Sequence, residues 1–171
     1  MKQEFHRKIV ISGMLMAVIL ALAGFYIPVG ASKCFPIQHM VNVLAAVLLG
    51  PGWGIGIAFG ASLLRNIMGT GTLLAFPGSM AGAFLCGLVY RYTGHISLTC
   101  FAEVIGTGLI GGMLAYPIAV FILGKEAALF TFVVPFLVST AGGSIAAALL
   151  IHALERSRVL AYMKERLASR D

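Results

Sequence analysis

The chain has 171 residues, of which 60% are hydrophobic and only 11% are charged. A soluble domain usually carries about 25% charged residues, so this composition excludes an ordinary soluble domain and predicts an integral membrane protein. The apolar residues form continuous runs rather than an alternating pattern, which excludes a water-filled outer-membrane barrel and favours an all-α fold. The net charge of +6 comes from cations that flank the apolar runs, a topology signal rather than a nucleic-acid-binding pattern.

Apolar stretches follow one another along the whole chain, which we interpret as one membrane domain covering residues 1–171. Six spans are predicted at about 9–27, 39–49, 54–64, 72–90, 97–123 and 127–153. Pro28, Gly30 and Pro36 predict a loop over 28–37, and Gly50-Pro51-Gly52 separates the two short spans. Residues 155–171 form a charged amphipathic tail, which we expect to be a cytoplasmic surface helix.

The number of spans depends on whether residues 39–64 form one span or two. With six spans and a cytoplasmic N-terminus, the cations outside are Lys33, Arg65 and Lys125, and the other nine lie inside. A single joined span would put five cations inside and seven outside. The positive-inside rule therefore favours six transmembrane helices in the cell membrane, with both termini in the cytoplasm.

Small residues recur every fourth position in the first span, at Gly13, Ala17 and Ala21. This spacing puts them on one helical face, where another helix can approach closely. The stripe could pack within this chain or against a partner subunit, and the spacing does not decide between the two.

Polar and aromatic residues cluster on the predicted outer side, although polar groups are costly in hydrocarbon and usually face a cavity or a partner. The candidates for a binding site are Lys33, Phe35, Gln38, His39, Asn42, Arg65, Asn66, Phe76, Ser79 and Tyr116. Simpler roles are open for several: the two cations could be solvated, Asn66 could cap a turn, and Gln38 and His39 could cap a helix start. Cys34 is a further candidate for the wall of the site.

Glu103 is the only acid well inside a span, roughly 10 Å from the inner end by helix rise. It could be a structural contact to a histidine or a helix hydroxyl, or it could reach the ligand from below. The chain has no Walker A, HExxH or GxSxG motif, and its histidines and carboxylates lack metal-ligand spacing. We therefore expect no enzyme activity, no cofactor and no metal site.

Several segments closely resemble the ThiW family, the substrate-binding S components of energy-coupling factor (ECF) transporters. They are Lys33-Cys34-Phe35-Pro36-Ile37-Gln38-His39-Met40-Val41-Asn42-Val43-Leu44, Ser62-Leu63-Leu64-Arg65-Asn66, Gly69-Thr70-Gly71, Leu74-Ala75-Phe76-Pro77-Gly78-Ser79-Met80 and Glu103-Val104-Ile105-Gly106-Thr107-Gly108. The resemblance covers roughly residues 5–155.

The resemblance implies a six-helix subunit that captures a thiamine precursor, hydroxyethylthiazole, for vitamin uptake. It also implies partners: a transmembrane coupling subunit, which would contact Gly13, Ala17 and Ala21, and two ATPase subunits. Loops 28–38 and 65–71 would close over the ligand. Two alternatives stay open: an S component for another small precursor such as a pyrimidine, and a membrane enzyme or channel that uses Glu103 and His39.

Overall fold

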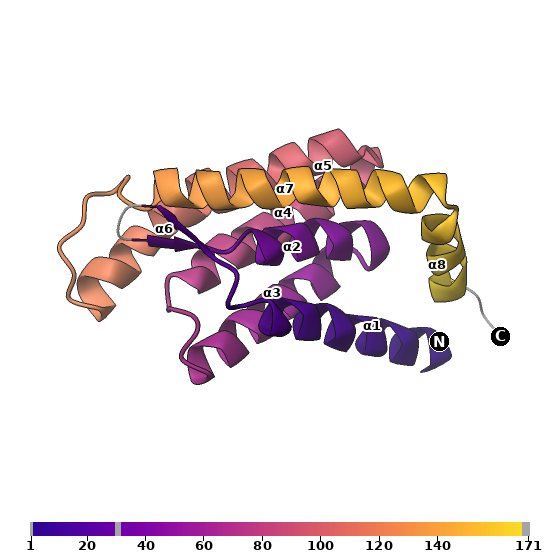
Figure 1. Cartoon of the computed structure of the whole chain (residues 1–171), viewed down its shortest axis with the longest axis horizontal. Coiled ribbons are helices and arrows are strands. Elements are labelled where there is room, and N and C mark those ends of the chain that lie inside the picture. Colours follow the sequence, from indigo (N-terminus) through magenta and orange to yellow (C-terminus); the bar gives the residue numbers. More distant parts are fainter. Residues whose placement is uncertain (1, 30–31, 169–171) are drawn as a thin grey trace.

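The structure, a computed structural model, describes residues 2–29 and 32–168. The described chain is nearly all helical, as the sequence predicted, with one short two-stranded hairpin. In Figure 1 the N-terminus of α1 and helix α8 lie at one end of a helical bundle, here called the terminal end, and the hairpin lies at the other, the hairpin end. Successive long helices run back and forth between these two ends.

The elements in chain order are α1 (Lys2–Ala21), β1 (Ile27–Val29), β2 (Ser32–Cys34), α2 (Pro36–Leu48), α3 (Pro51–Ile67), α4 (Ala75–Thr93), α5 (Ile96–Glu103), η1 (Val104–Gly111), α6 (Gly112–Pro117), η2 (Ile118–Ile122), α7 (Val133–Arg156) and α8 (Val159–Ala168). The segments α5, η1, α6 and η2 form one continuous rod over Ile96–Ile122, in which η1 and η2 are π-helical. Residues 39–64, whose division into spans was open, are two helices, α2 and α3.

Proline and glycine set several of these boundaries. Pro36 and Pro51 occupy the first turns of α2 and α3, where a missing N–H costs no helical hydrogen bond. Gly50 precedes α3 with φ of 87°, and Gly94 ends α4 in the left-handed conformation with φ of 66°. A side chain is disfavoured at both backbone conformations, so glycine is needed there.

The structure corrects the predicted bounds of the first span and of the loop after it. Helix α1 starts at Lys2 and ends at Ala21, whereas the predicted span covered 9–27. Hydropathy marks an apolar run rather than a helix, and polar residues extend α1 through pairs such as Lys8 with Glu4, 2.6 Å apart. Beyond α1, Ile27 pairs with Cys34 in an antiparallel hairpin, so the expected loop is partly strand. Helix α7 likewise begins at Val133 rather than near residue 127.

Helix α4 and the π-helical η1 cross at very short range. A Cβ on Gly106 would lie 2.8 Å from Gly82 Cα, and one on Gly111 would collide with Gly78 Cα. Glycine on both helices is therefore required for the backbones to touch. Such close packing of small residues is typical of helices that associate in lipid.

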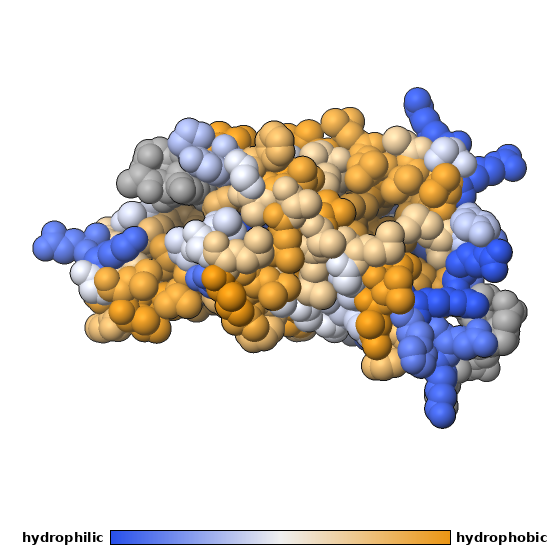
Figure 2. All heavy atoms as spheres, turned by 60° about the horizontal axis from the view of Figure 1, so that its bottom comes forward, coloured by the Kyte–Doolittle hydropathy of each residue, from blue (hydrophilic) through white to orange (hydrophobic). Residues whose placement is uncertain are grey.

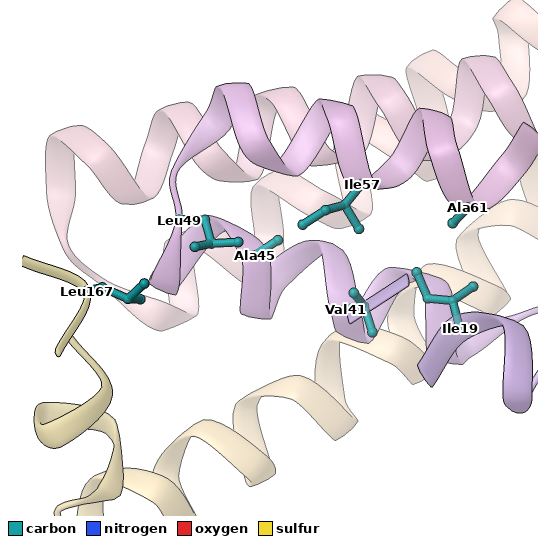
Figure 3. Packing of buried hydrophobic residues seen from close by; sticks show 7 residues of the cluster. All are labelled: Ile19, Val41, Ala45, Leu49, Ile57, Ala61 and Leu167. Carbon is teal, nitrogen blue, oxygen red and sulfur yellow. The ribbon is translucent and has the colours of Figure 1, made fainter. Parts of the chain in front are cut away.

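An apolar cluster joins the first three helices and α8. Figure 3 shows Ile19, Val41, Ala45, Leu49, Ile57, Ala61 and Leu167, all of them buried. Leu167 brings α8 against this cluster at the terminal end, so the C-terminal helix packs onto the bundle through an apolar residue.

The outside of the bundle is also apolar. Large hydrophobic side chains are exposed on successive helices, including Val10, Phe59, Phe84, Phe101 and Leu149. Figure 2 shows a broad hydrophobic surface on one face of the molecule, with hydrophilic residues gathered mainly at the terminal end. By length and composition, the rod Ile96–Ile122 and helix α7 could each cross a membrane. An apolar exterior of this extent is what a lipid-embedded protein needs.

Candidate functional site

Helix α2 brings polar side chains into the middle of the bundle. It packs against α4 and α7, and Gln38, His39 and Asn42 are all buried. The sequence spacing of three and four residues puts them on one face, as expected. Gly143 of α7 lets the two helices approach, because a Cβ there would lie 2.7 Å from His39 Cβ.

Glu103 lies at the centre of this buried polar region. Its Oε1 accepts hydrogen bonds from His39 Nδ1 at 3.1 Å, Asn42 Nδ2 at 3.0 Å and Thr107 Oγ1 at 2.9 Å. The carboxyl group is fully buried, and its Oε2 has no hydrogen-bond partner among the described residues. Of the two roles left open by the sequence, the contact to a histidine and a helix hydroxyl is present.

Gly82 makes room for this carboxylate. A Cβ on Gly82 would collide with Thr107 Oγ1 and would lie 2.6 Å from Glu103 Oε2. The close crossing of α4 and η1 thus has a second consequence, because it brings the Glu103 carboxylate against helix α4.

Arg65 forms the second charged point, in the last turn of α3. The side chain is buried, with its guanidinium carbon 3.7 Å from the centre of the Phe35 ring. One terminal nitrogen donates to Gln38 Oε1, and the other donates to the Thr70 carbonyl at 3.3 Å. Arg65 therefore ties the turn after α3 to the start of α2.

A continuous chain of hydrogen bonds links the two charged points. Gln38 Nε2 donates to Ser62 Oγ at 3.0 Å, and Ser62 Oγ lies 3.1 Å from Ser79 Oγ. The carbonyl of Ser79 accepts from Asn42 Nδ2 at 3.1 Å, and the same amide reaches Glu103. Chains of this kind hold their members in defined positions, because a change at one member leaves its neighbour unpaired.

A cavity opens beside this chain. Its empty volume is about 480 Å³ counted up to its mouth, of which about 60 Å³ is open to the centre of a water molecule. It is lined by Cys34, Phe35, Gln38, His39, Arg65, Thr72, Ala75, Gly78, Ser79, Thr107, Pro135, Phe136 and Ser139. A concave space with apolar walls and a few converging polar groups is the usual form of a small-molecule site.

The hairpin forms one wall and is tied to α7. Phe35 N donates to Ser139 Oγ at 2.8 Å, and Cys34 Sγ donates to the Pro135 carbonyl at 3.1 Å. Burial raises the pKa of the Cys34 thiol, so the group stays protonated and can donate this bond at neutral pH. The Phe35 ring also lies near Tyr26, with ring centres 6.0 Å apart.

Five of the predicted site residues line the cavity: Phe35, Gln38, His39, Arg65 and Ser79. Asn42 does not line it, but lies behind the wall in contact with Glu103. The side chain of Lys33 lies outside the described part of the structure.

The other three predicted site residues do not belong to the cavity wall. Asn66 donates to the carbonyls of Ser62 and Thr72, which is the turn-capping role that the sequence left open. Phe76 packs against Phe59 with ring centres 5.6 Å apart, and Tyr116 is absent from the cavity lining.

Sequence reasoning missed several wall residues. Phe136 and Ser139 come from α7, a helix in which the sequence predicted no site residue. Thr107 could have been found, because it follows Glu103 by four residues and so shares its helical face. The signal for Ser139 is weaker, since it depends on how α7 is rotated against the hairpin.

The small-residue stripe of α1 lies on the outside of the described chain. Gly13, Ala17 and Ala21 are all exposed, and a Cβ on Gly13 would meet nothing within 4 Å. Of the two roles left open by the sequence, packing within this chain is therefore wrong for these residues.

The model of the ThiW family, described as a thiamine-precursor transporter protein, matches residues 9–157. Comparison with curated proteins and with solved structures gave no match. Together with the apolar exterior and the polar cavity, the family match places the chain among membrane transport proteins for small molecules. The chain belongs to the ThiW family of thiamine-precursor transporters, and a transporter family favours transport over catalysis.

Proposed function

We propose that this chain is the substrate-capture subunit, or S component, of an ECF transporter, and that it takes up hydroxyethylthiazole, the thiazole precursor of thiamine. The observation that carries the proposal is the cavity between α2, α4, η1, α7 and the hairpin, in a chain of the ThiW family. The sequence contains no Walker A motif, which supports capture by this subunit and energy supply by others.

The proposed ligand contacts follow from the wall of the cavity. Phe35 and Phe136 are the aromatic faces on which a thiazole ring can stack. Gln38, His39 and Ser79 are the polar groups for its ring nitrogen and hydroxyl. While Glu103 is ionised it can only accept, so the proton of their contact lies on His39 Nδ1 and Nε2 remains for another partner.

The proposed topology has six membrane-spanning rods and cytoplasmic termini. Helices α1, α2, α3, α4 and α7, together with the rod Ile96–Ile122, supply six rods. Figure 1 supports an even number of crossings, because the start of α1 and the end of α7 lie at the same end of the bundle. The cavity then opens toward the outside, next to the hairpin.

The partners in this proposal are a transmembrane coupling subunit, seated on Gly13, Ala17 and Ala21, and two ATPase subunits.

Calorimetry on the detergent-solubilised chain tests the ligand. Hydroxyethylthiazole is expected to bind with a stoichiometry of one, and a pyrimidine precursor of thiamine is expected not to bind. Gln38→Leu should weaken thiazole binding by roughly tenfold or more, because it removes a wall amide and leaves Arg65 with one partner fewer. The matched control is Gln3→Leu, at an exposed position in α1. Binding of the pyrimidine instead of the thiazole would contradict the proposed ligand but keep the transport role.

A further inference from the structure

Arg65 is a cation in an unusual place. Its side chain is only 1% exposed, although it lies in the last turn of α3 next to a glycine-rich turn. Gly71 packs directly on it, with a Cβ there predicted to lie 3.0 Å from Arg65 Cβ. A buried guanidinium is costly unless partners replace the water that it has lost.

The described residues replace that water only in part. A guanidinium has five N–H donors, and the hydrogen bonds found for Arg65 are one to Gln38 Oε1 and one to the Thr70 carbonyl. The Phe35 ring covers one face of the guanidinium but supplies no hydrogen-bond acceptor oxygen. Its Nε is buried without a hydrogen-bond partner in the described chain. Both acceptors are neutral oxygens, and no carboxylate of the described residues lies within 4.0 Å of the guanidinium.

The cavity wall next to Arg65 carries no compensating negative charge. The wall includes Arg65 and His39 but no aspartate or glutamate among the described residues. The nearest acid in the hydrogen-bond chain is Glu103, which lies behind the wall and accepts three donors on one oxygen. Its Oε1 therefore contacts His39, Asn42 and Thr107 rather than the guanidinium.

We infer that the ligand of this cavity carries an anionic oxygen group, a phosphate or a carboxylate, that pairs with Arg65. Such a group supplies the acceptors and the charge that the protein leaves out, and pairs of this kind form the stronger class of hydrogen bonds. The hydroxyls of Thr72 and Ser139 lie in the same wall and can donate to further anionic oxygens. This inference rests on the proposed function and refines its substrate class: the preferred thiazole is an anionic derivative, such as the phosphate ester of hydroxyethylthiazole, rather than the free alcohol.

The test compares ligands that differ only in the side arm of the ring. Calorimetry on the purified chain would use hydroxyethylthiazole, its phosphate monoester, and the thiazole that carries a carboxymethyl group in place of hydroxyethyl. At least one anionic thiazole is expected to bind about tenfold more tightly, or better, than the alcohol. The phosphate and carboxylate arms identify which anion the site prefers.

A variant ties the preference to Arg65. Arg65→Gln should reduce the ratio of the affinity for the anionic thiazole to the affinity for the alcohol to about twofold or less. Arg65→Lys keeps the positive charge but not the two-pronged guanidinium, so it should retain part of this preference. The matched control is Arg91→Gln, an exposed arginine in the last turn of α4, for which the ratio should not change. The wild-type ratio stands by itself if the Arg65 variants do not fold.

The outcomes separate this inference from the proposed function. If the alcohol binds as tightly as both anionic thiazoles, the inference is wrong and the thiazole assignment survives. If no thiazole binds, the thiazole assignment is wrong, and a pyrimidine alcohol and its phosphate ester repeat the comparison. Lack of an anionic preference in either pair overturns the inference.

Discussion

Helices α1 and α2 are neighbours in the chain and both are apolar, yet their surroundings are opposite. Helix α1 has 20 residues, of which only Ser12 and Ile19 are buried. Helix α2 has 13 residues, and nine of them are buried, including Gln38, His39 and Asn42. The polar residues of α2 can be buried because α3, α4 and α5 supply partners for them: Ser62 and Arg65, Ser79, and Glu103. Helix α1 instead presents small and apolar residues to whatever surrounds the bundle.

This difference shows that an apolar composition alone does not tell which helix carries the functional site. An apolar side chain does not reveal whether it faces lipid or the protein interior, because both are apolar surroundings. What distinguishes the two helices is the presence of polar residues without a route to water, which need a fixed partner. Changes in the inner region should therefore alter stability and ligand binding, and changes on the exposed face of α1 should leave both intact.

The largest effect is expected from adding one carbon atom at the inner helix crossing. Gly82→Ala should lower the free energy of unfolding by about 3 kcal/mol or more. The added Cβ would collide with Thr107 and with the Glu103 carboxylate. Helix α4 and the rod Ile96–Ile122 cannot move apart to relieve this clash without opening the core. Thermal unfolding in detergent measures the change. Gly13→Ala on α1 is the matched control and should not be destabilising, since nothing lies within 4 Å of the added atom. Equal losses for the two variants would mean that the contrast between the helices is wrong.

A smaller effect is expected from the side-chain amide of Asn42, which connects the Ser79 carbonyl with Glu103 in the chain of hydrogen bonds. Asn42→Leu removes the donors to the Ser79 carbonyl and to Glu103, and His39 is then held less firmly at the cavity wall. We expect ligand affinity to fall roughly ten- to hundredfold, about 1–3 kcal/mol, measured by calorimetry. Met40→Leu, a volume-conserving change on the same helix, should leave the affinity unchanged. Wild-type affinity for Asn42→Leu would show that this amide serves packing alone.

The sequence predicted the polar face of α2, but it left Arg65 open between a site residue and a solvated cation, and Glu103 open between a structural contact and a ligand contact. Rise along a straight helix put Glu103 in the inner half, away from an outward-facing site. That depth was calculated along one helix, whereas the partners of Glu103 come from α2, which carries His39 and Asn42 into the bundle. The depth of a residue along its own helix does not show which residues of the neighbouring helices lie at the same depth.

The aromatic residues of the site illustrate a second limit. Phe76 and Tyr116 were chosen for their predicted depth, yet Phe76 packs on Phe59 and Tyr116 lies outside the cavity wall. The rotation of each helix about its own axis decides which side a residue faces, and packing between helices sets that rotation. Phe35 was predictable because Pro36 fixes the helix start directly after it, which leaves less freedom in its position.

The smallest effect on the purified chain is expected at the exposed stripe. Ala17→Leu adds volume at a position that is exposed in this structure, so unfolding free energy and ligand affinity should change by less than about 0.5 kcal/mol. Transport in cells that express the whole complex should nevertheless be lost, because a larger side chain would hold a partner helix away from α1. Ala17→Ser keeps the side chain small and should retain transport. Loss of thiazole binding in purified Ala17→Leu would contradict the separation of α1 from the site. Normal transport by that variant would instead remove this face of α1 from the proposed contact with a coupling subunit, and leave lipid as its neighbour.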